Sequence, residues 1–126
     1  MSMRTPLKTA RYLGSAKDGT EHFWRQRVTA VANIFLLSFL VWLIASLAGA
    51  DYATAKATLS NPLVDLALLC LILSAMVHMR IGMQTIIEDY VHGEGMKIAA
   101  LLLNTFFAVL VAVACIFAVV KLSLGA

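Results

Sequence analysis

The sequence predicts an all-α membrane protein with three transmembrane helices. Hydrophobic residues make up 61% of the 126 residues, charged residues only 13%, and the mean hydropathy is +0.87. Residues 28–50 and 98–120 contain no charged side chain, and residues 62–87 contain few ionisable groups. A helix of about 20 residues crosses roughly 30 Å of hydrocarbon, so each stretch is long enough to span a membrane. Runs this continuous are unlike the alternating pattern of a transmembrane barrel, which leaves helices as the expected form.

The first predicted helix covers about residues 28–50. Its apolar core is longer than the roughly 7 to 15 residues of a signal peptide, so we expect it to be retained in the membrane. Polar and basic residues dominate positions 1–21, which we expect to be poorly ordered. The sequence therefore divides into a basic N-terminal segment, residues 1–27, and a three-helix membrane anchor, residues 28–126.

The second and third predicted helices cover about residues 62–88 and 97–121. Either Ser60 or Asn61 can cap the second helix, and Pro62 suits its first turn because the missing N–H group has no partner there. Glycines between the two helices supply a flexible exit before the third helix begins.

Basic residues are concentrated before the first predicted helix. They are Arg4, Lys8, Arg11, Lys17, Arg25 and Arg27. In contrast, the first connecting loop has only Lys56, and the C-terminal end has only Lys121. The positive-inside rule therefore predicts a cytoplasmic N-terminus and an external C-terminus. The net charge of +3 reflects this asymmetry and does not indicate a nucleic-acid partner.

One narrow face of the second predicted helix carries its small and polar residues. At 100° per residue, a stripe within about 40° of His78 also contains Ser74, Gly82, Thr85 and Asp89. Lipid offers such groups no hydrogen-bond partner. The stripe is therefore expected to face protein or a cofactor.

The stripe leaves two interpretations of His78 open. Gly82, one turn further on, leaves space where a flat and bulky group could press against the backbone, as an axial haem ligand requires. The alternative is a histidine that is hydrogen-bonded to a neighbouring helix. Arg80 lies off the stripe, where it can extend to lipid phosphates, a partner subunit or a propionate.

Asp89 and Tyr90 are expected near the cytoplasmic membrane surface. Asp89 follows His78 by about 16 Å along the helix axis. A tyrosine hydroxyl at this depth can donate a hydrogen bond to a quinone carbonyl, and a carboxylate can orient a basic partner or relay protons. An ordinary interfacial tyrosine beside a solvated acid is the alternative.

Residues 78–93, HMRIGMQTIIEDYVHG, carry the pattern H-x-x-x-G-M-x-x-x-x-x-D-Y-V-H-G. Together with the basic N-terminal segment and three helices, this pattern resembles the smaller hydrophobic membrane anchors of succinate dehydrogenase, respiratory complex II. The resemblance extends over the chain from His22 onward and is closest to the alphaproteobacterial and mitochondrial branch. It implies a multi-pass protein of the bacterial inner membrane, surrounded by lipid.

The resemblance implies a four-subunit complex, in which a flavoprotein oxidises succinate and an iron-sulfur subunit carries electrons to the membrane. Two anchor subunits hold haem b and a ubiquinone site. By this resemblance, His78 is an axial ligand of the haem iron, and the second, cytochrome b anchor subunit supplies the other. The resemblance places Arg27 and His22 near the haem propionates. It also implies that Tyr90 hydrogen-bonds the quinone and that Asp89 supports this site.

Two other functions fit parts of this pattern. One is the anchor of a fumarate reductase, which has the same architecture and runs the reaction backwards. The other is a haem-free transport or assembly subunit, in which His78 and Arg80 line a polar path or bind a neighbouring helix. Transport is disfavoured because the apolar stretches of the first and third predicted helices, residues 28–50 and 98–120, contain no charged residue. The sequence has no motif for binding flavin, nicotinamide or an iron-sulfur cluster, so the chain alone is not expected to be an enzyme. The sequence pattern indicates no chemical role for His92.

Overall fold

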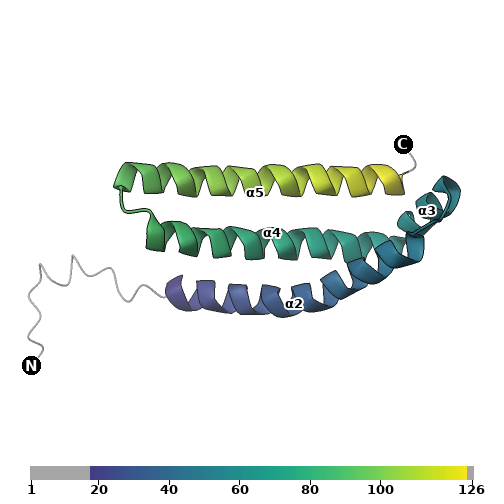
Figure 1. Cartoon of the computed structure of the whole chain (residues 1–126), viewed down its shortest axis with the longest axis horizontal. Coiled ribbons are helices and arrows are strands. Elements are labelled where there is room, and N and C mark those ends of the chain that lie inside the picture. The colour runs from purple at the N-terminus through teal and green to yellow at the C-terminus, as the bar shows by residue number, and fades with distance from the viewer. Residues whose placement is uncertain (1–17, 125–126) are drawn as a thin grey trace, which may run out of the picture.

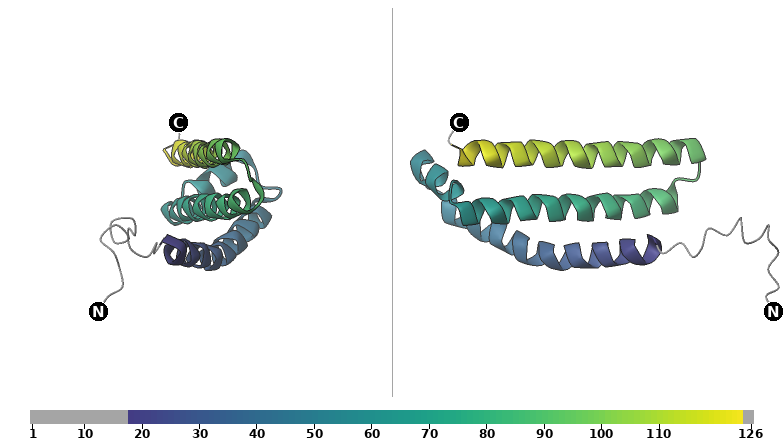
Figure 2. Two further views of the ribbon diagram at one scale, coloured as in Figure 1. Left: turned by 90° about the vertical axis from the view of Figure 1, so that its left-hand side faces the viewer. Right: turned by 180° about the vertical axis from the view of Figure 1, so that it is seen from behind.

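The computed structural model describes residues 18–124, which form four helices and no strand. The helices are α2 (Asp18–Leu47), α3 (Tyr52–Leu59), α4 (Pro62–Tyr90) and α5 (Glu94–Ser123). The three long helices lie side by side in one row, with α4 between α2 and α5 (Figures 1 and 2). The beginning of α2, the end of α4 and the beginning of α5 share one end of the row, and α3 lies at the other end.

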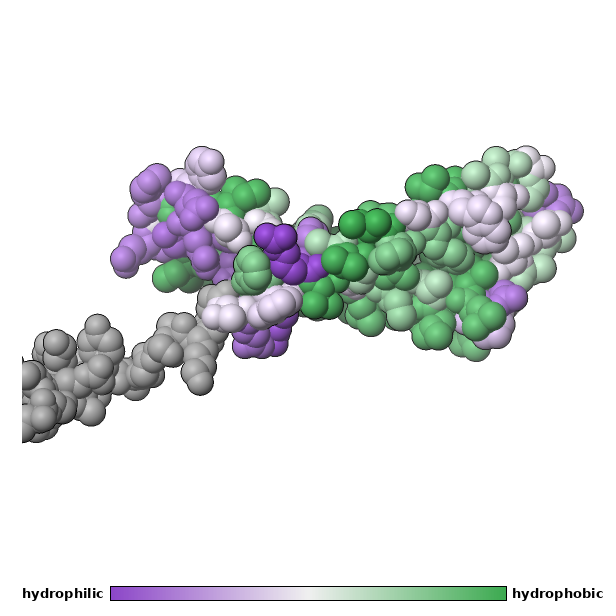
Figure 3. All heavy atoms as spheres, turned by 90° about the horizontal axis from the view of Figure 1, so that it is seen from below, coloured by the Kyte–Doolittle hydropathy of each residue, from purple (hydrophilic) through white to green (hydrophobic). Residues whose placement is uncertain are grey.

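The prediction of three membrane-spanning helices is confirmed. Helical segments Thr20–Leu47, Pro62–Tyr90 and Glu94–Ser123 are each long and apolar enough to cross a membrane. Figure 3 shows an apolar band along the α2 side of the molecule, with more hydrophilic residues towards its ends.

Two helices begin earlier than hydropathy predicts. Helix α2 already includes residues 18–21, which were expected to be poorly ordered, while residues 1–17 lie outside the described part of the chain. Helix α5 begins at Glu94, so Gly95 lies in its first turn and only Gly93 remains as the residue before the helix. A helix can continue beyond the hydrocarbon into the polar headgroup region, where hydropathy no longer marks its end.

Helix α3 was not predicted from the sequence. Gly49 leaves the end of α2 with a φ of 82°, a conformation that glycine adopts at no steric cost. Asp51 then caps α3, because its carboxylate accepts a 3.0 Å hydrogen bond from the Thr54 backbone N–H. This cap allows eight residues to form a helix outside the three apolar stretches.

The start of α4 agrees with the sequence signal. Asn61 is the cap, and its side-chain oxygen accepts a 2.9 Å hydrogen bond from the backbone N–H of Leu63. Pro62 is the first helical residue. Ser60, the other candidate cap, instead donates its hydroxyl to the Leu122 carbonyl at 3.3 Å and so joins the end of α3 to the end of α5.

Packing in this row buries few side chains. The buried residues are Asn33 and Leu43 on α2, Leu71, Ile81 and Ile87 on α4, and Asn104 and Ala108 on α5. Most large apolar side chains stay exposed, because a row of three helices encloses no central core. These exposed faces are suited to lipid or to further apolar helices.

Asn104 provides a test of the α4–α5 contact. Its side-chain amide donates a 2.9 Å hydrogen bond to the Arg80 carbonyl. Replacing Asn104→Leu should lower the free energy of unfolding in mixed micelles by about 0.6 kcal/mol, the average for hydrogen bonds between membrane helices, and by at most about 1.7 kcal/mol. The matched control is Thr105→Val, because the Thr105 hydroxyl bonds only to Leu101 of its own helix. Equal losses in both variants would contradict an interhelical role for Asn104.

Acidification should loosen α3. Hydrogen bonds from the Thr54 hydroxyl and backbone N–H lower the pKa of Asp51 below its ordinary value of 3.8. Because the folded-state pKa is depressed, the cap stabilises α3 above pH 3.8, and this contribution is lost as the pH falls through the lower folded value. Backbone NMR shifts of residues 52–59 in micelles should report the transition. Asp51→Asn keeps an acceptor that does not titrate, and an identical acid transition in this variant would contradict the assignment.

Candidate functional site

The polar stripe of α4 lies against α2. His78 Nδ1 is 3.1 Å from the hydroxyl oxygen of Thr29, and the Ser74 hydroxyl donates to the Thr29 carbonyl at 3.4 Å. One residue of α2 therefore contacts two residues of the stripe through different atoms. As the helical periodicity predicts, these groups find protein partners within the membrane segment.

His78 is half-buried, and only one of its ring nitrogens is engaged. Nε2 makes no hydrogen bond within residues 18–124. The same part of the chain contains no group of three histidine, cysteine or acidic residues that could hold a metal ion. This donor set fits a metal centre that takes one imidazole nitrogen from this chain, as a haem iron with axial ligands does.

One side chain of α2 reaches the space beside Gly82. A Cβ atom at Gly82 would lie 3.3 Å from the side-chain nitrogen of Gln26. That atom is the far end of a flexible side chain, and Ile81 and Thr85, on either side of Gly82, line a hollow, so the expectation that Gly82 leaves space for a flat group stays a prediction. The side-chain oxygens of Gln26 and Asn33 are buried and have no hydrogen-bond partner among the described residues.

His22 and Arg27 come together at the beginning of α2. They border a hollow of about 290 Å³ whose other lining residues are Phe23, Gln26, Ile81 and Thr85. The Arg27 guanidinium carbon lies 5.0 Å from the centre of the Phe23 ring, so the aromatic face helps to hold this cation. A guanidinium and an imidazole beside one hollow are suited to binding carboxylate groups. Thr85 connects the hollow to the polar stripe.

A second hollow adjoins the contact between Thr29 and His78. It has a volume of about 420 Å³, and it is lined by Trp24, Arg25, Val28, Thr29 and Val77. Most of these side chains present apolar atoms. This hollow therefore offers an apolar surface next to Thr29, the partner of His78.

Asp89 and Tyr90 lie apart from both hollows, at the end of α4. Tyr90 is the last residue of the helix and is 77% exposed, and Asp89 is also exposed. The Lys97 ammonium donates a 3.2 Å hydrogen bond to the Glu88 carbonyl, which stabilises this helix end. The tyrosine hydroxyl and the carboxylate are thus accessible to a ligand or a partner at the end that holds the beginning of α2 (Figure 1).

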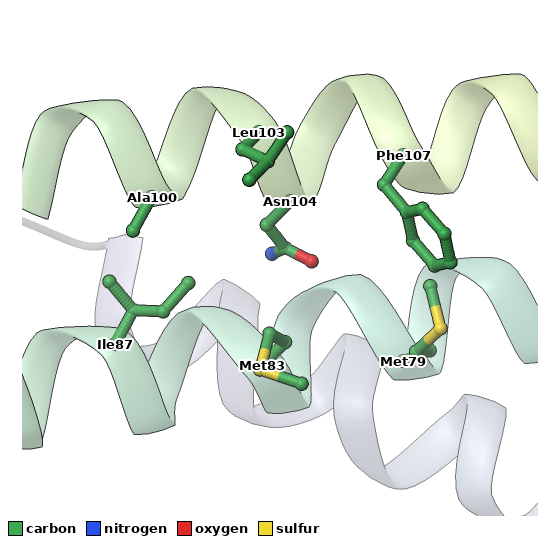
Figure 4. Close-up of a pocket in the computed structure, with 7 residues that line it drawn as sticks. All are labelled: Met79, Met83, Ile87, Ala100, Leu103, Asn104 and Phe107. Carbon is green, nitrogen blue, oxygen red and sulfur yellow. The ribbon is translucent and has the colours of Figure 1, made fainter.

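The groove between α4 and α5 differs in character. It has a volume of about 370 Å³ and is lined by Met79, Met83, Ile87, Ala100, Leu103, Asn104 and Phe107 (Figure 4). The Asn104 amide points towards α4, where its hydrogen bond to the backbone satisfies it. Because no lining side chain is titratable, this groove offers packing surface and no acid–base or ligating group. Arg80 is exposed and lies outside all three hollows.

Three residues of this site were not predicted from the sequence. Gln26, Thr29 and Asn33 are spaced three and four residues apart, which places them on one face of α2. That spacing was the available signal. The first two of these residues lie in or beside the basic segment before the first apolar stretch, where charge masks the helical pattern.

Comparison with known proteins gives consistent matches over most of the chain. Residues 1–118 match the family described as succinate dehydrogenase/fumarate reductase transmembrane subunit. A relative from Paracoccus denitrificans, named succinate dehydrogenase hydrophobic membrane anchor subunit, is 33% identical over 122 residues, covering 97% of this chain and 94% of the relative. A relative of the same name from Rickettsia bellii is 28% identical over 116 residues, which cover 92% of this chain and 93% of the relative.

A more distant relative comes from Reclinomonas americana and is named succinate dehydrogenase membrane anchor subunit. It is 28% identical over 96 residues, which cover 74% of this chain and 80% of the relative. No solved structure gives a significant match.

Proposed function

Because the chain belongs to the succinate dehydrogenase/fumarate reductase transmembrane subunit family, we propose that it contributes one axial haem ligand and part of a ubiquinone site to such a complex. The chain is a multi-pass membrane-anchor subunit of the bacterial inner membrane and is not catalytic alone. Its proposed partners are a flavoprotein subunit, an iron-sulfur subunit and a second, cytochrome b anchor subunit.

The half-buried imidazole of His78 is the observation that carries the haem proposal. One ring nitrogen is held by Thr29, and the other has no partner within the described residues. When bound, a b-type haem supplies one-electron redox chemistry. His78 would hold its iron from one side, and the second axial ligand would come from the cytochrome b anchor subunit. Arg27 and His22 would bind the propionates, which is supported by the hollow that they share.

The exposed end of α4 supports the quinone proposal. Tyr90 would donate a hydrogen bond from its hydroxyl to a quinone carbonyl, and Asp89 would orient the site. The positive-inside rule places this end at the cytoplasmic surface, which is where electrons from a peripheral iron-sulfur subunit would arrive. Quinone reduction consumes two electrons and two protons, so a site at the aqueous surface has access to the protons.

The three relatives favour the direction of succinate oxidation, because all of them carry the name succinate dehydrogenase. The family description covers fumarate reductase as well, and an anchor of that enzyme is the alternative. A haem-free assembly subunit is the other alternative, since the hydrogen bond between His78 and Thr29 would also suit a histidine with a purely structural role.

Replacing His78→Ala in the complete complex should lower the haem content or convert the haem to a high-spin form, because one axial nitrogen is lost. The reduced-minus-oxidised absorption spectrum, normalised to flavin, measures this change. His92→Ala is the matched control, since His92 is exposed and lies outside both α2–α4 hollows. A wild-type low-spin spectrum in His78→Ala would support the assembly role instead.

Replacing Tyr90→Phe should lower succinate:quinone activity by roughly tenfold, which corresponds to losing one hydrogen bond of about 1.4 kcal/mol. Succinate oxidation by a soluble dye should stay unchanged, because that assay bypasses the quinone site. Tyr52→Phe is the control, since Tyr52 is 75% exposed and begins α3 at the other end of the molecule. An equal loss in both assays would argue against a quinone role for Tyr90.

A further inference from the structure

We propose that Thr29 is a positioning residue that sets the tautomer and ring orientation of His78, leaving the Nε2 lone pair directed away from Thr29 and available to a metal. This inference deepens the proposed function and rests on His78 being the haem ligand. It assigns a role to a residue of α2 that neither the sequence pattern of α4 nor the matches to relatives single out.

The inference rests on the Thr29 hydroxyl having only one hydrogen to donate. Its oxygen lies 2.7 Å from the Arg25 carbonyl, 3.2 Å from the Gln26 carbonyl and 3.1 Å from His78 Nδ1. Both carbonyls can only accept hydrogen bonds, whereas the hydroxyl has a single hydrogen to donate. That hydrogen is therefore used within α2, with the nearer Arg25 carbonyl as its main acceptor.

His78 Nδ1 must then be the donor in its contact with Thr29. If the hydroxyl donated to Nδ1 instead, two pairs of oxygen atoms would face each other at 2.7 and 3.2 Å without a hydrogen between them. With the proton on Nδ1, that nitrogen donates to the Thr29 oxygen, and the single hydroxyl hydrogen remains for the Arg25 carbonyl, which the more distant Gln26 carbonyl can only share. In the neutral ring the other nitrogen, Nε2, then carries the lone pair that a metal requires.

The Thr29 hydroxyl is itself held in place. Thr29 is β-branched, so few side-chain rotamers are open to it in a helix, and its bond to the preceding turn selects one of them. Its backbone carbonyl also accepts the Ser74 hydroxyl at 3.4 Å, one turn before His78 on α4. Side-chain and backbone contacts of the same residue thus fix the register of α2 against the part of α4 that carries His78.

A donor bond from Nδ1 makes the imidazole a more basic ligand, in the way that outer partners of metal-bound histidines generally do. A more basic ligand favours the oxidised metal. Removing the Thr29 hydroxyl is therefore expected to raise the haem midpoint potential as well as to weaken haem binding.

The test compares Thr29→Val and Thr29→Ser in the complete complex. Thr29→Val keeps the shape and removes the hydroxyl, and it should lower haem affinity about 10- to 100-fold. Its midpoint potential should rise, and a tenfold change in the relative affinity for the two redox states corresponds to about 59 mV for one electron. Thr29→Ser keeps the hydroxyl, so its haem affinity and midpoint potential should stay at the wild-type values. Haem-to-flavin ratio, redox titration and the low-spin EPR g values are the measurements.

Two further variants make each outcome decisive. Thr105→Val is the matched control on α5, because its hydroxyl bonds only within its own helix, and it should leave the haem unchanged. Thr29→Ala removes the hydroxyl with less apolar bulk and replaces Thr29→Val if that variant does not assemble. Wild-type haem content, potential and g values in Thr29→Val or Thr29→Ala would overturn the role of Thr29.

The His78→Ala variant distinguishes failure of the positioning role of Thr29 from failure of the proposed haem-binding function. If His78→Ala loses the low-spin haem while the Thr29 variants match the wild type, only the positioning role is wrong. If His78→Ala itself retains the wild-type spectrum, His78 is not the ligand, and both proposals fall.

Discussion

Polar groups inside hydrocarbon must find their partners within protein, and the α2–α4 contact is where this chain meets that requirement. In hydrocarbon, an unpaired hydroxyl or imidazole would cost several kcal/mol. The Thr29 side chain is hydrogen-bonded to His78, and the Thr29 backbone carbonyl accepts a hydrogen bond from the Ser74 hydroxyl. A Cβ atom at Gly82 would lie 3.3 Å from the end of the Gln26 side chain, so a larger residue there would require this side chain to move. The position of the candidate site follows from this contact.

The central position of α4 divides the molecule into two unlike interfaces. Towards α2, the helix presents its polar stripe, and towards α5 it presents methionine and isoleucine side chains around a groove with no titratable group. Asn104 is the polar exception on the α5 side, and it is used to bind the α4 backbone. Helix α5 therefore packs on the side of α4 away from α2, while the candidate site residues lie on α2 and on the face of α4 that meets it.

The sequence was informative where a single segment contains its own signal. Hydropathy located the three spans, the sequence before Pro62 located the start of α4, and helical periodicity located the stripe around His78. It was uninformative where the structure depends on pairing between segments. The partner of His78 depends on the register of α2 against α4, and the side chain that reaches the space at Gly82 depends on the same register. Helix α3 was missed for another reason, because its eight residues are too few and too polar for a periodic signal.

The α2–α4 contact also indicates why this chain functions as part of an assembly. Each buried acceptor without a partner costs about 1–3 kcal/mol, and the side-chain oxygens of Gln26 and Asn33 are two such acceptors within the described chain. Nε2 of His78 lies at the same interface without a hydrogen bond there. The two oxygens are already enclosed, whereas both broad faces of the row stay open and carry exposed apolar side chains. Further apolar helices packed on these faces would cover them, so we expect the stability of the row to depend on neighbouring subunits of the complex.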